Sequence, residues 1–155
     1  TTSTACAGAY QTANAGNSAD FGSNGTSGSF SMACNLGTDT YDSVNSGITY
    51  SNAPVSSIGL NVVCRTNDPN NFQHRRNGVQ VLNWPAYHSG FCDLPILLGA
   101  LGPVSNNLWS DNKVCHHFMA SFTLAELQTY ETLVNNLQGD IEVALGLSAG
   151  DRKKY

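Results

Sequence analysis

The hydrophobic pattern changes period twice within residues 113–147, and this change constrains the fold more than any other feature of the sequence. Thr123 and Glu126 form a capping box, in which the two side chains satisfy backbone N–H groups at a helix start. Gly139 follows as a permissive residue just past the expected helix end. The sequence therefore predicts a helix over residues 123–138, whose apolar face repeats at spacings of three and four: Leu124, Leu127, Tyr130, Val134 and Leu137.

The segments on either side of this helix alternate with a period of two, which is typical of β-strands. Residues 114–122 are largely apolar on both faces, and this pattern predicts a strand that is buried on both sides. Residues 141–147 alternate apolar with small or polar residues and predict a second strand. The connections are so short that we expect the helix to lie across a sheet.

Similar alternation predicts strands over residues 30–36 and 58–65, with a shorter edge strand at 48–50. Asn77-Gly78 lies between two further alternating segments and predicts a β-hairpin, because both residues tolerate a positive φ angle. These strands and the single helix indicate a mainly β, α+β fold. We expect an antiparallel or mixed sheet, as a sandwich or a curled sheet, with the 123–138 helix packed on it.

Three segments lack a clear period. Residues 37–46 are polar and fit a solvated loop, whereas residues 94–101 fit either a short helix or a buried strand. Residues 1–29 are small and polar, and they predict an N-terminal arm that wraps its own domain or reaches a neighbour. Residues 30–155 then form a single β-rich globular domain.

The composition favours a secreted, extracellular protein. Only 12% of the residues are charged, and amide, hydroxyl and glycine residues are abundant instead. The chain opens at Thr1, which fits a mature terminus left after removal of a signal peptide, or else a trimmed terminus. Asn24 begins the sequon Asn-Gly-Thr and is a candidate glycosylation site. The net charge of −4 argues against a nucleic-acid partner, and no apolar run is long enough for a membrane span.

Five widely spaced cysteines indicate disulfides in such a protein, and no close Cys pair indicates a zinc ribbon or a redox motif; they are Cys6, Cys34, Cys64, Cys92 and Cys115. The spacing alone leaves the pairing open. We expect Cys6–Cys34 and Cys92–Cys115, with Cys64 as a buried thiol in an apolar strand. Because the number is odd, at least one cysteine is free or pairs with another chain.

The histidines provide the main candidates for chemistry. His116 and His117 resemble a metal pair, but adjacent residues of a strand point to opposite faces, so we expect neither a metal site nor a cofactor. His74 begins the cationic cluster His-Arg-Arg and could act with His88 or His117 in acid–base hydrolysis. No paired carboxylates, nucleophile elbow or phosphate-binding loop accompany them.

An aromatic cluster provides the main candidate for binding. Aromatic faces beside Asn and Asp residues serve both sugar binding and protein interfaces. The candidate residues are Trp84, Tyr87, His88 and Phe91 in one loop, with Trp109 in another.

These observations predict a secreted structural or interaction module rather than an enzyme. Its partner is expected to be another copy of itself or a surface glycan. In the strongest form it is a filament or coat subunit, in which the arm of one copy completes the sheet of the next. The alternatives are a carbohydrate-binding, lectin-like module that uses the aromatic loop, and a secreted hydrolase that uses its histidines, which are His74, His88, His116 and His117.

Overall fold

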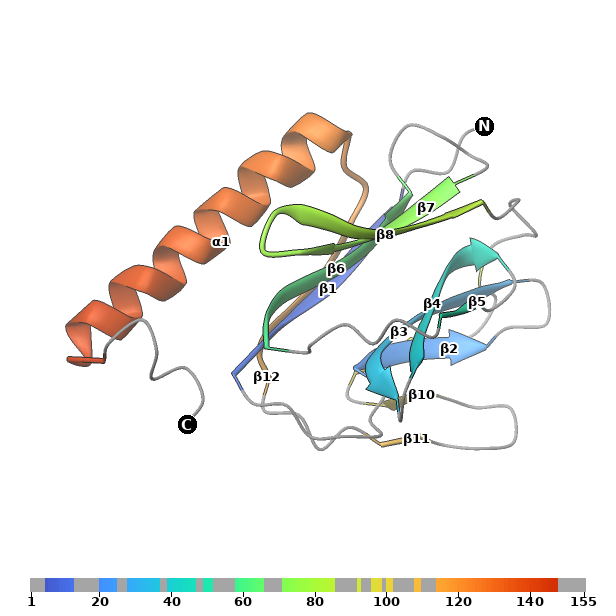
Figure 1. Cartoon of the computed structure of the whole chain (residues 1–155), viewed down its shortest axis with the longest axis horizontal. Coiled ribbons are helices and arrows are strands. Elements are labelled where there is room, and N and C mark those ends of the chain that lie inside the picture. Colours follow the sequence, from blue (N-terminus) through green and yellow to red (C-terminus); the bar gives the residue numbers. More distant parts are fainter. Residues whose placement is uncertain are drawn as a thin grey trace.

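The computed structural model describes residues 5–12, 20–24, 28–36, 39–46, 49–51, 58–65, 71–85, 92, 96–98, 100–101, 108–109 and 114–147. Within these residues the protein is mostly β, with two five-stranded antiparallel sheets and a single C-terminal helix (Figure 1). The predicted α+β fold class is therefore confirmed.

The first sheet has the strand order β12-β1-β6-β7-β8. Its strands are β1 (Ala5–Gln11), β6 (Gly59–Arg65), β7 (Asn71–Arg76), β8 (Val79–Pro85) and β12 (Val114–Ala120). β1 pairs with β12 on one side and with β6 on the other. The N-terminal strand, which lies in the segment predicted to be an arm, thus runs through the interior of this sheet in its own chain.

The second sheet has the order β5-β4-β3-β2-β9, and β10 pairs separately with β11. Its strands are β2 (Phe21–Asn24), β3 (Ser29–Leu36), β4 (Asp39–Ser46), β5 (Thr49–Ser51) and β9 (Leu97–Leu98), with β10 at Ala100–Leu101 and β11 at Leu108–Trp109. The described part of residues 94–101, whose structure the sequence left open, is therefore short strands.

The hairpin predicted at Asn77-Gly78 is confirmed, with φ angles of 49° and 85° at these two residues. They join β7 to β8 as a two-residue turn, because Arg76 pairs with Val79. The Asn77 side chain also accepts a hydrogen bond from the Leu60 backbone N–H at 2.9 Å, which fastens the turn to β6.

One loop prediction and one burial prediction are wrong. Residues 39–46 form β4 rather than a polar loop, because this segment pairs with β3 on one side and β5 on the other. Pairing on both sides overrides the weak β-propensity of its polar residues. β12 is not buried on both faces either: it lies at a sheet edge, and the Met119 side chain is 54% exposed.

Helix α1 (Leu124–Ala144) begins where the sequence predicts. The Thr123 hydroxyl accepts a hydrogen bond from the Glu126 N–H, and the Glu126 carboxylate accepts one from the Thr123 N–H at 2.8 Å. Hydrogen bonds from the Thr123 backbone and hydroxyl hold the pKa of the Glu126 carboxyl below its usual value.

The predicted end of this helix near Gly139 and the predicted strand over 141–147 are both wrong. A Cβ at Gly139 would meet nothing within 4 Å, so the glycine costs the helix only its propensity, about 1 kcal/mol. The helix ends instead at Ala144, and Gly146 follows its C-cap with a φ of +69°. The Gly146 N–H bonds to the Val143 carbonyl and the Leu147 N–H to the Glu142 carbonyl, which is a Schellman motif.

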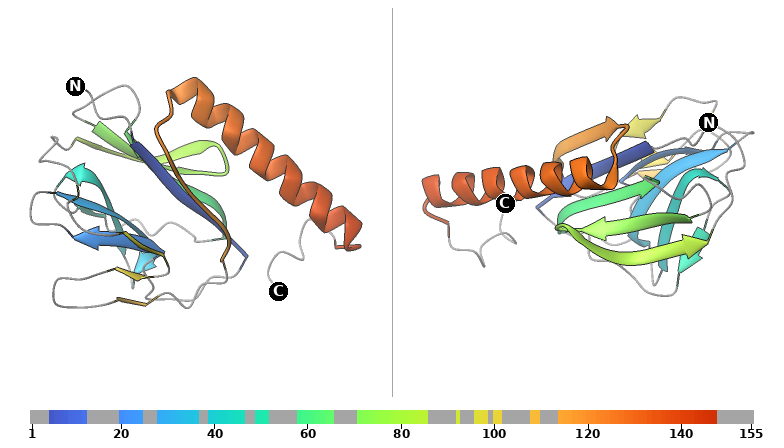
Figure 2. Two further views of the ribbon diagram at one scale, coloured as in Figure 1. Left: turned by 180° about the vertical axis from the view of Figure 1, so that it is seen from behind. Right: turned by 90° about the horizontal axis from the view of Figure 1, so that it is seen from above.

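The first sheet contributes to two buried clusters, one on each face. The cluster shared with the second sheet contains Ala7, Ala9, Phe21, Phe30, Met32, Cys34, Val63 and Phe72. The cluster beneath α1 contains Cys6, Tyr10, Leu60, Val62, Cys64 and Leu127. Successive residues of β1 and β6 alternate between the two clusters, as side chains of a strand must. Figure 2 shows that the C-terminal half of α1 extends past the end of the first sheet.

Gly8 and Gly139 provide a paired test of this packing. A Cβ on Gly8 would lie 2.5 Å from the Asn61 carbonyl oxygen and 2.6 Å from the Phe118 ring. We expect Gly8→Ala to lower the free energy of unfolding by about 1–3 kcal/mol through overpacking. Gly139→Ala, in open space within the helix, should raise the same free energy by about 0.5–1 kcal/mol. Urea titration monitored by circular dichroism measures both. Equal effects of the two substitutions would contradict the placement of β1.

Candidate interaction surface

A buried ion pair fixes α1 on the first sheet. The Arg75 guanidinium on β7 donates to both carboxylate oxygens of Glu131, with Nε–Oε1 at 2.9 Å and Nη2–Oε2 at 3.0 Å. The two side chains are only 6% and 1% exposed. Arg75 also donates to the Gly78 carbonyl, so the same side chain joins the helix to the hairpin turn.

Aromatic side chains fill the space between the first half of α1 and β12. Tyr130 packs on Phe118, with ring centroids 4.5 Å apart, and on Phe122 at 5.4 Å. Its hydroxyl forms a hydrogen bond with Nε2 of His116. These contacts, together with the fully buried Leu127, anchor the N-terminal half of the helix.

From its middle to its C-cap, α1 exposes large apolar side chains instead. Leu133 is 62% exposed, Leu137 60%, Ile141 44% and Leu145 67%. A spacing of four places these side chains in one line along a helix. We call these four residues the α1 apolar row. Val143 is also 77% exposed, but its position in the helix lies away from this row.

A pocket of about 180 Å³ adjoins the α1 apolar row, between the helix and the first sheet. Its lining residues are Tyr10, His116, Val134, Leu137, Gln138 and Ile141. Leu137 and Ile141 therefore belong to both the row and the pocket. Together they form an apolar surface that continues from the exposed helix into a hollow.

Strand β8 is a second exposed element. It lies at the edge of the first sheet, and its Val79 and Val81 side chains are 64% and 41% exposed. An edge strand carries backbone N–H and C=O groups that can pair with another strand. The sequence did not single out either valine, because exposure of a hairpin strand depends on which neighbours the sheet provides.

Most of the predicted aromatic site lies outside the described residues: Tyr87, His88 and Phe91. The structure places the backbone of Trp84 in β8 and of Trp109 in β11, but their side chains are not described. Asn24, the predicted glycosylation site, ends β2, and its side chain is likewise not described. The structure therefore does not test these predictions.

Of the predicted histidines, His88 lies outside the described residues, and His116 and His117 contact different parts of the protein. His116 contacts Tyr130 on the helix side of β12, whereas His117 forms a hydrogen bond with the Asp20 backbone. Burial lowers the pKa of His117, and the hydrogen bond to Asp20 opposes this shift. Within the described part of the chain, no three His, Cys, Asp or Glu side chains are grouped so that they could hold a metal ion.

His74 belongs to a buried polar cluster that the sequence did not reveal. Its Nε2 lies 3.7 Å from the Cys34 sulfur and 3.2 Å from Oδ1 of Asn61, and all three residues are fully buried. A Cys–His–Asn hydrolase needs its cysteine and its asparagine on different ring nitrogens, and a substrate must reach the sulfur. Here both contacts share one nitrogen, so the cluster fits a structural role between the sheets. Its members come from three strands, and only the sheet topology brings them together.

The cysteines are arranged differently from the prediction. Cys6 lies directly opposite Cys64 in the register of β1 and β6. The Cys64 thiol donates a hydrogen bond to the Cys6 sulfur, which lowers the pKa of Cys6 and raises that of Cys64. Cys34 belongs to the cluster on the other face of the sheet, so the expected Cys6–Cys34 bridge is wrong. Cys92 lies beside Ser23, and the Cys115 side chain is not described. The four cysteines with described side chains are free thiols.

In the described residues, no helix has the length and apolar character that crossing a membrane requires. No protein-family model matches the chain, and comparisons with curated proteins and with solved structures give no significant match.

Substitution of Glu131 tests whether the ion pair with Arg75 holds the helix on the sheet. Glu131→Ala leaves the buried Arg75 guanidinium without its counter-charge, and we expect the free energy of unfolding to fall by about 3–5 kcal/mol. Gln128→Ala changes an exposed residue of the same helix, and it should change the free energy of unfolding by no more than about 0.5 kcal/mol. Chemical denaturation measures both. If the two variants unfold at the same urea concentration, the ion pair does not hold the helix.

His117 predicts a dependence of stability on pH. Burial holds its folded-state pKa below the ordinary value of 6.5, so the unfolded chain binds more protons as the pH approaches this value. Stability therefore rises with pH through this window and is lost as the pH falls below it. We expect the free energy of unfolding to decrease from about pH 7.5 to about pH 5.5, and to decrease less in His117→Gln. Gln128→Ala, which changes an exposed residue with no titratable side chain, is the control. An unchanged slope in the His117 variant would refute the assignment.

Proposed function

We propose that this chain is a self-associating structural or interaction module that works outside the cytoplasm, and that a second copy covers the α1 apolar row. One observation carries the proposal. Four large apolar side chains form a continuous line on a helix whose C-terminal half extends past the sheet (Figures 1 and 2). Single exposed apolar residues are common on protein surfaces, but a contiguous group beside a pocket is typical of an interface.

The free energy of burying this row supports association. Full burial of one Leu or Ile side chain contributes about 1.5–3 kcal/mol. The row contains three leucines and one isoleucine, from Leu133 to Leu145, and all are at least 44% exposed in the single chain. Even partial burial of four such side chains is comparable with the cost of bringing two proteins together.

A second copy fits this surface because the row can pack against its own equivalent. Side chains spaced by four form a ridge along a helix, and two such ridges interdigitate in the commonest class of helix packing. Contact between identical surfaces also gives a closed, symmetric dimer. A second copy of this chain can therefore provide the whole partner surface.

The charges of the chain are compatible with association of two copies. Helix α1 has four carboxylates and no basic residue, but Arg75 already neutralises Glu131. None of the four row residues is charged. The sequence also contains three basic residues after α1, at positions 152–154, so the same chain supplies both signs.

Assembly beyond a dimer requires a second contact surface, and β8 is the best candidate. It is an edge strand of seven residues with two exposed valines, and edge strands accept strands from other chains. We assign the contacts to α1 and β8 rather than to an N-terminal arm, because β1 is already paired on both sides in its own chain. Two different surfaces on each subunit are what a filament or coat needs. The low charged fraction of 12% supports an extracellular location.

Substitution within the row tests this function. We expect the original protein to sediment as a dimer or larger species at micromolar concentration, and Leu137→Lys to weaken association at least about tenfold. A lysine there places a charge at the centre of the buried contact. Val143→Lys is the matched control, because it adds the same charge to an exposed apolar position of the same helix outside the row.

Analytical ultracentrifugation over a range of concentrations measures association, and circular dichroism checks that α1 stays folded. An original protein that remains monomeric at its highest soluble concentration contradicts the proposal. Equal weakening by Leu137→Lys and Val143→Lys would place the interface elsewhere.

A further inference from the structure

Two cysteines face each other across neighbouring strands of the first sheet. Cys6 on β1 is the direct register partner of Cys64 on β6. Such partners in an antiparallel pair have Cα atoms about 4.5–5.5 Å apart, which lies within the range of about 4.4–6.8 Å found in disulfides. Both side chains belong to the cluster beneath α1 and point to the same face. Register partners of this kind therefore have a backbone separation compatible with a disulfide.

We propose that Cys6 and Cys64 form a disulfide between β1 and β6 when the protein folds in oxidising surroundings. The bond fastens the N-terminal strand, which contributes to both buried clusters, to the middle of the sheet. This modification site is independent of the proposed self-association, since it lies inside one chain and beneath the helix.

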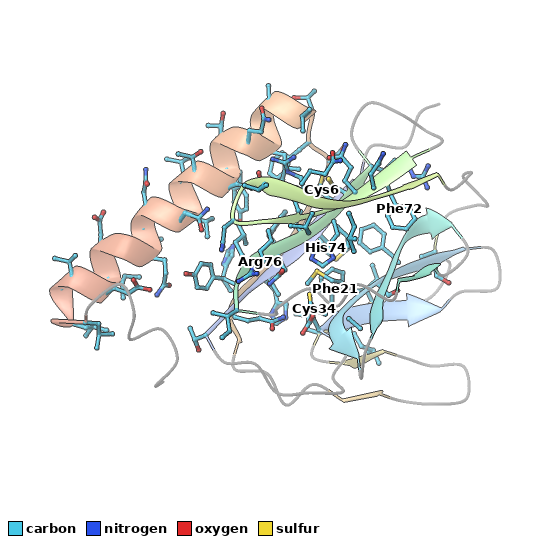
Figure 3. The ribbon with its side chains drawn as sticks, in the orientation of Figure 1. Cys6, Phe21, Cys34, Phe72, His74 and Arg76 are labelled. Carbon is cyan, nitrogen blue, oxygen red and sulfur yellow. The ribbon has the colours of Figure 1, made fainter. Side chains whose placement is uncertain are left out.

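The other described cysteines do not compete for this bond. Cys34 lies in the cluster on the opposite face of the sheet, where its sulfur contacts His74. Figure 3 shows Cys6 and Cys34 well apart. Cys92 packs against the same cluster as Cys34, and its sulfur lies 3.8 Å from the Ser23 carbonyl oxygen. A bridge from Cys6 to either residue would have to pass through the sheet.

The reaction is thiol–disulfide exchange with a small-molecule disulfide such as glutathione disulfide. The Cys6 thiolate attacks one sulfur of the oxidant, forming a mixed disulfide and releasing one glutathione thiolate. The Cys64 thiolate then attacks the Cys6 sulfur, forming the protein disulfide and releasing the second glutathione. The two protein thiols lose two protons and two electrons, and the oxidant is reduced to two thiols.

Burial decides when the bond can form. Cys6 is 1% exposed and Cys64 is fully buried, so an oxidant cannot reach either sulfur in the folded sheet. Oxidation must therefore occur while β1 is still undocked, or when the sheet opens. Once formed, the same burial protects the bond from reductants. The thiols of a protein folded under reducing conditions should correspondingly react slowly with glutathione disulfide.

Peptide mapping tests the pairing directly, because cleavage before aspartate places every cysteine on a different fragment. Cuts at Asp20, Asp39, Asp42 and Asp68 put Cys6 on residues 1–19, Cys34 on 20–38 and Cys64 on 42–67; Asp93 and Asp111 separate Cys92 from Cys115. The protein is refolded with a glutathione redox pair, its remaining thiols are alkylated, and it is digested without reduction. Circular dichroism first confirms that the refolded material is native.

We expect fragments 1–19 and 42–67 to be recovered joined, with a mass two hydrogens below the sum of the reduced fragments. Reductant should lower the melting temperature of the oxidised protein by roughly 5–15 °C, since the bond constrains a long loop of the unfolded chain. Cys34→Ala should keep both the joined fragments and this shift, whereas Cys6→Ala and Cys64→Ala should lose both.

The proposal is overturned if native, oxidised protein gives fragments 1–19 and 42–67 separate and alkylated. It is also overturned if fragment 1–19 is joined to a fragment other than 42–67. Mapping of the unmodified sequence decides the question even where a cysteine variant does not fold. An oxidised monomer with the expected bridge would support this inference while contradicting self-association, so the two proposals fail separately.

Discussion

The structure depends on burial of the first sheet on both of its faces. Every residue of β6 is buried, and β1 is buried from Cys6 onward, so alternate side chains of these strands serve two different clusters. Such strands must carry small or well-fitted residues on both sides. Gly8 illustrates the constraint, because a Cβ there would collide with the neighbouring strand and with Phe118. Strand β1 is therefore a structural part of the sheet, although the composition of residues 1–29 resembles that of an unfolded chain.

The unequal contacts along α1 follow from the same arrangement. Its first half lies over the sheet, where Leu127 enters the buried cluster and Arg75 pairs with Glu131. Its second half extends past the end of the sheet (Figure 1). The residues of the α1 apolar row consequently remain exposed, although their chemistry is that of a core. An exposed apolar face of this kind is the physical basis of the proposed assembly.

Features that depend on a few adjacent residues were predictable. The turn at Asn77-Gly78 and the cap at Thr123 need only local backbone geometry and side-chain hydrogen bonds, and both occur as predicted. The end of α1 was not predictable in the same way. Gly139 and Gly146 are equally permissive, and the choice between them depended on whether the intervening residues were helical or extended. Ile141 to Leu147 satisfied a period of two by coincidence, while Leu133, Leu137 and Ile141 satisfied a spacing of four.

The sequence by itself determined the α+β class, the hairpin turn, the helix start and the weakly charged surface. The reason is that each of these follows from local conformational preference or from composition. Only the tertiary structure decided that β1 is an interior strand, that Cys6 lies opposite Cys64, and that the α1 apolar row is exposed. These features depend on pairing between residues far apart in the chain and on where the sheet ends beneath the helix. Neither strand register nor the extent of a neighbouring surface is encoded in any single stretch of sequence.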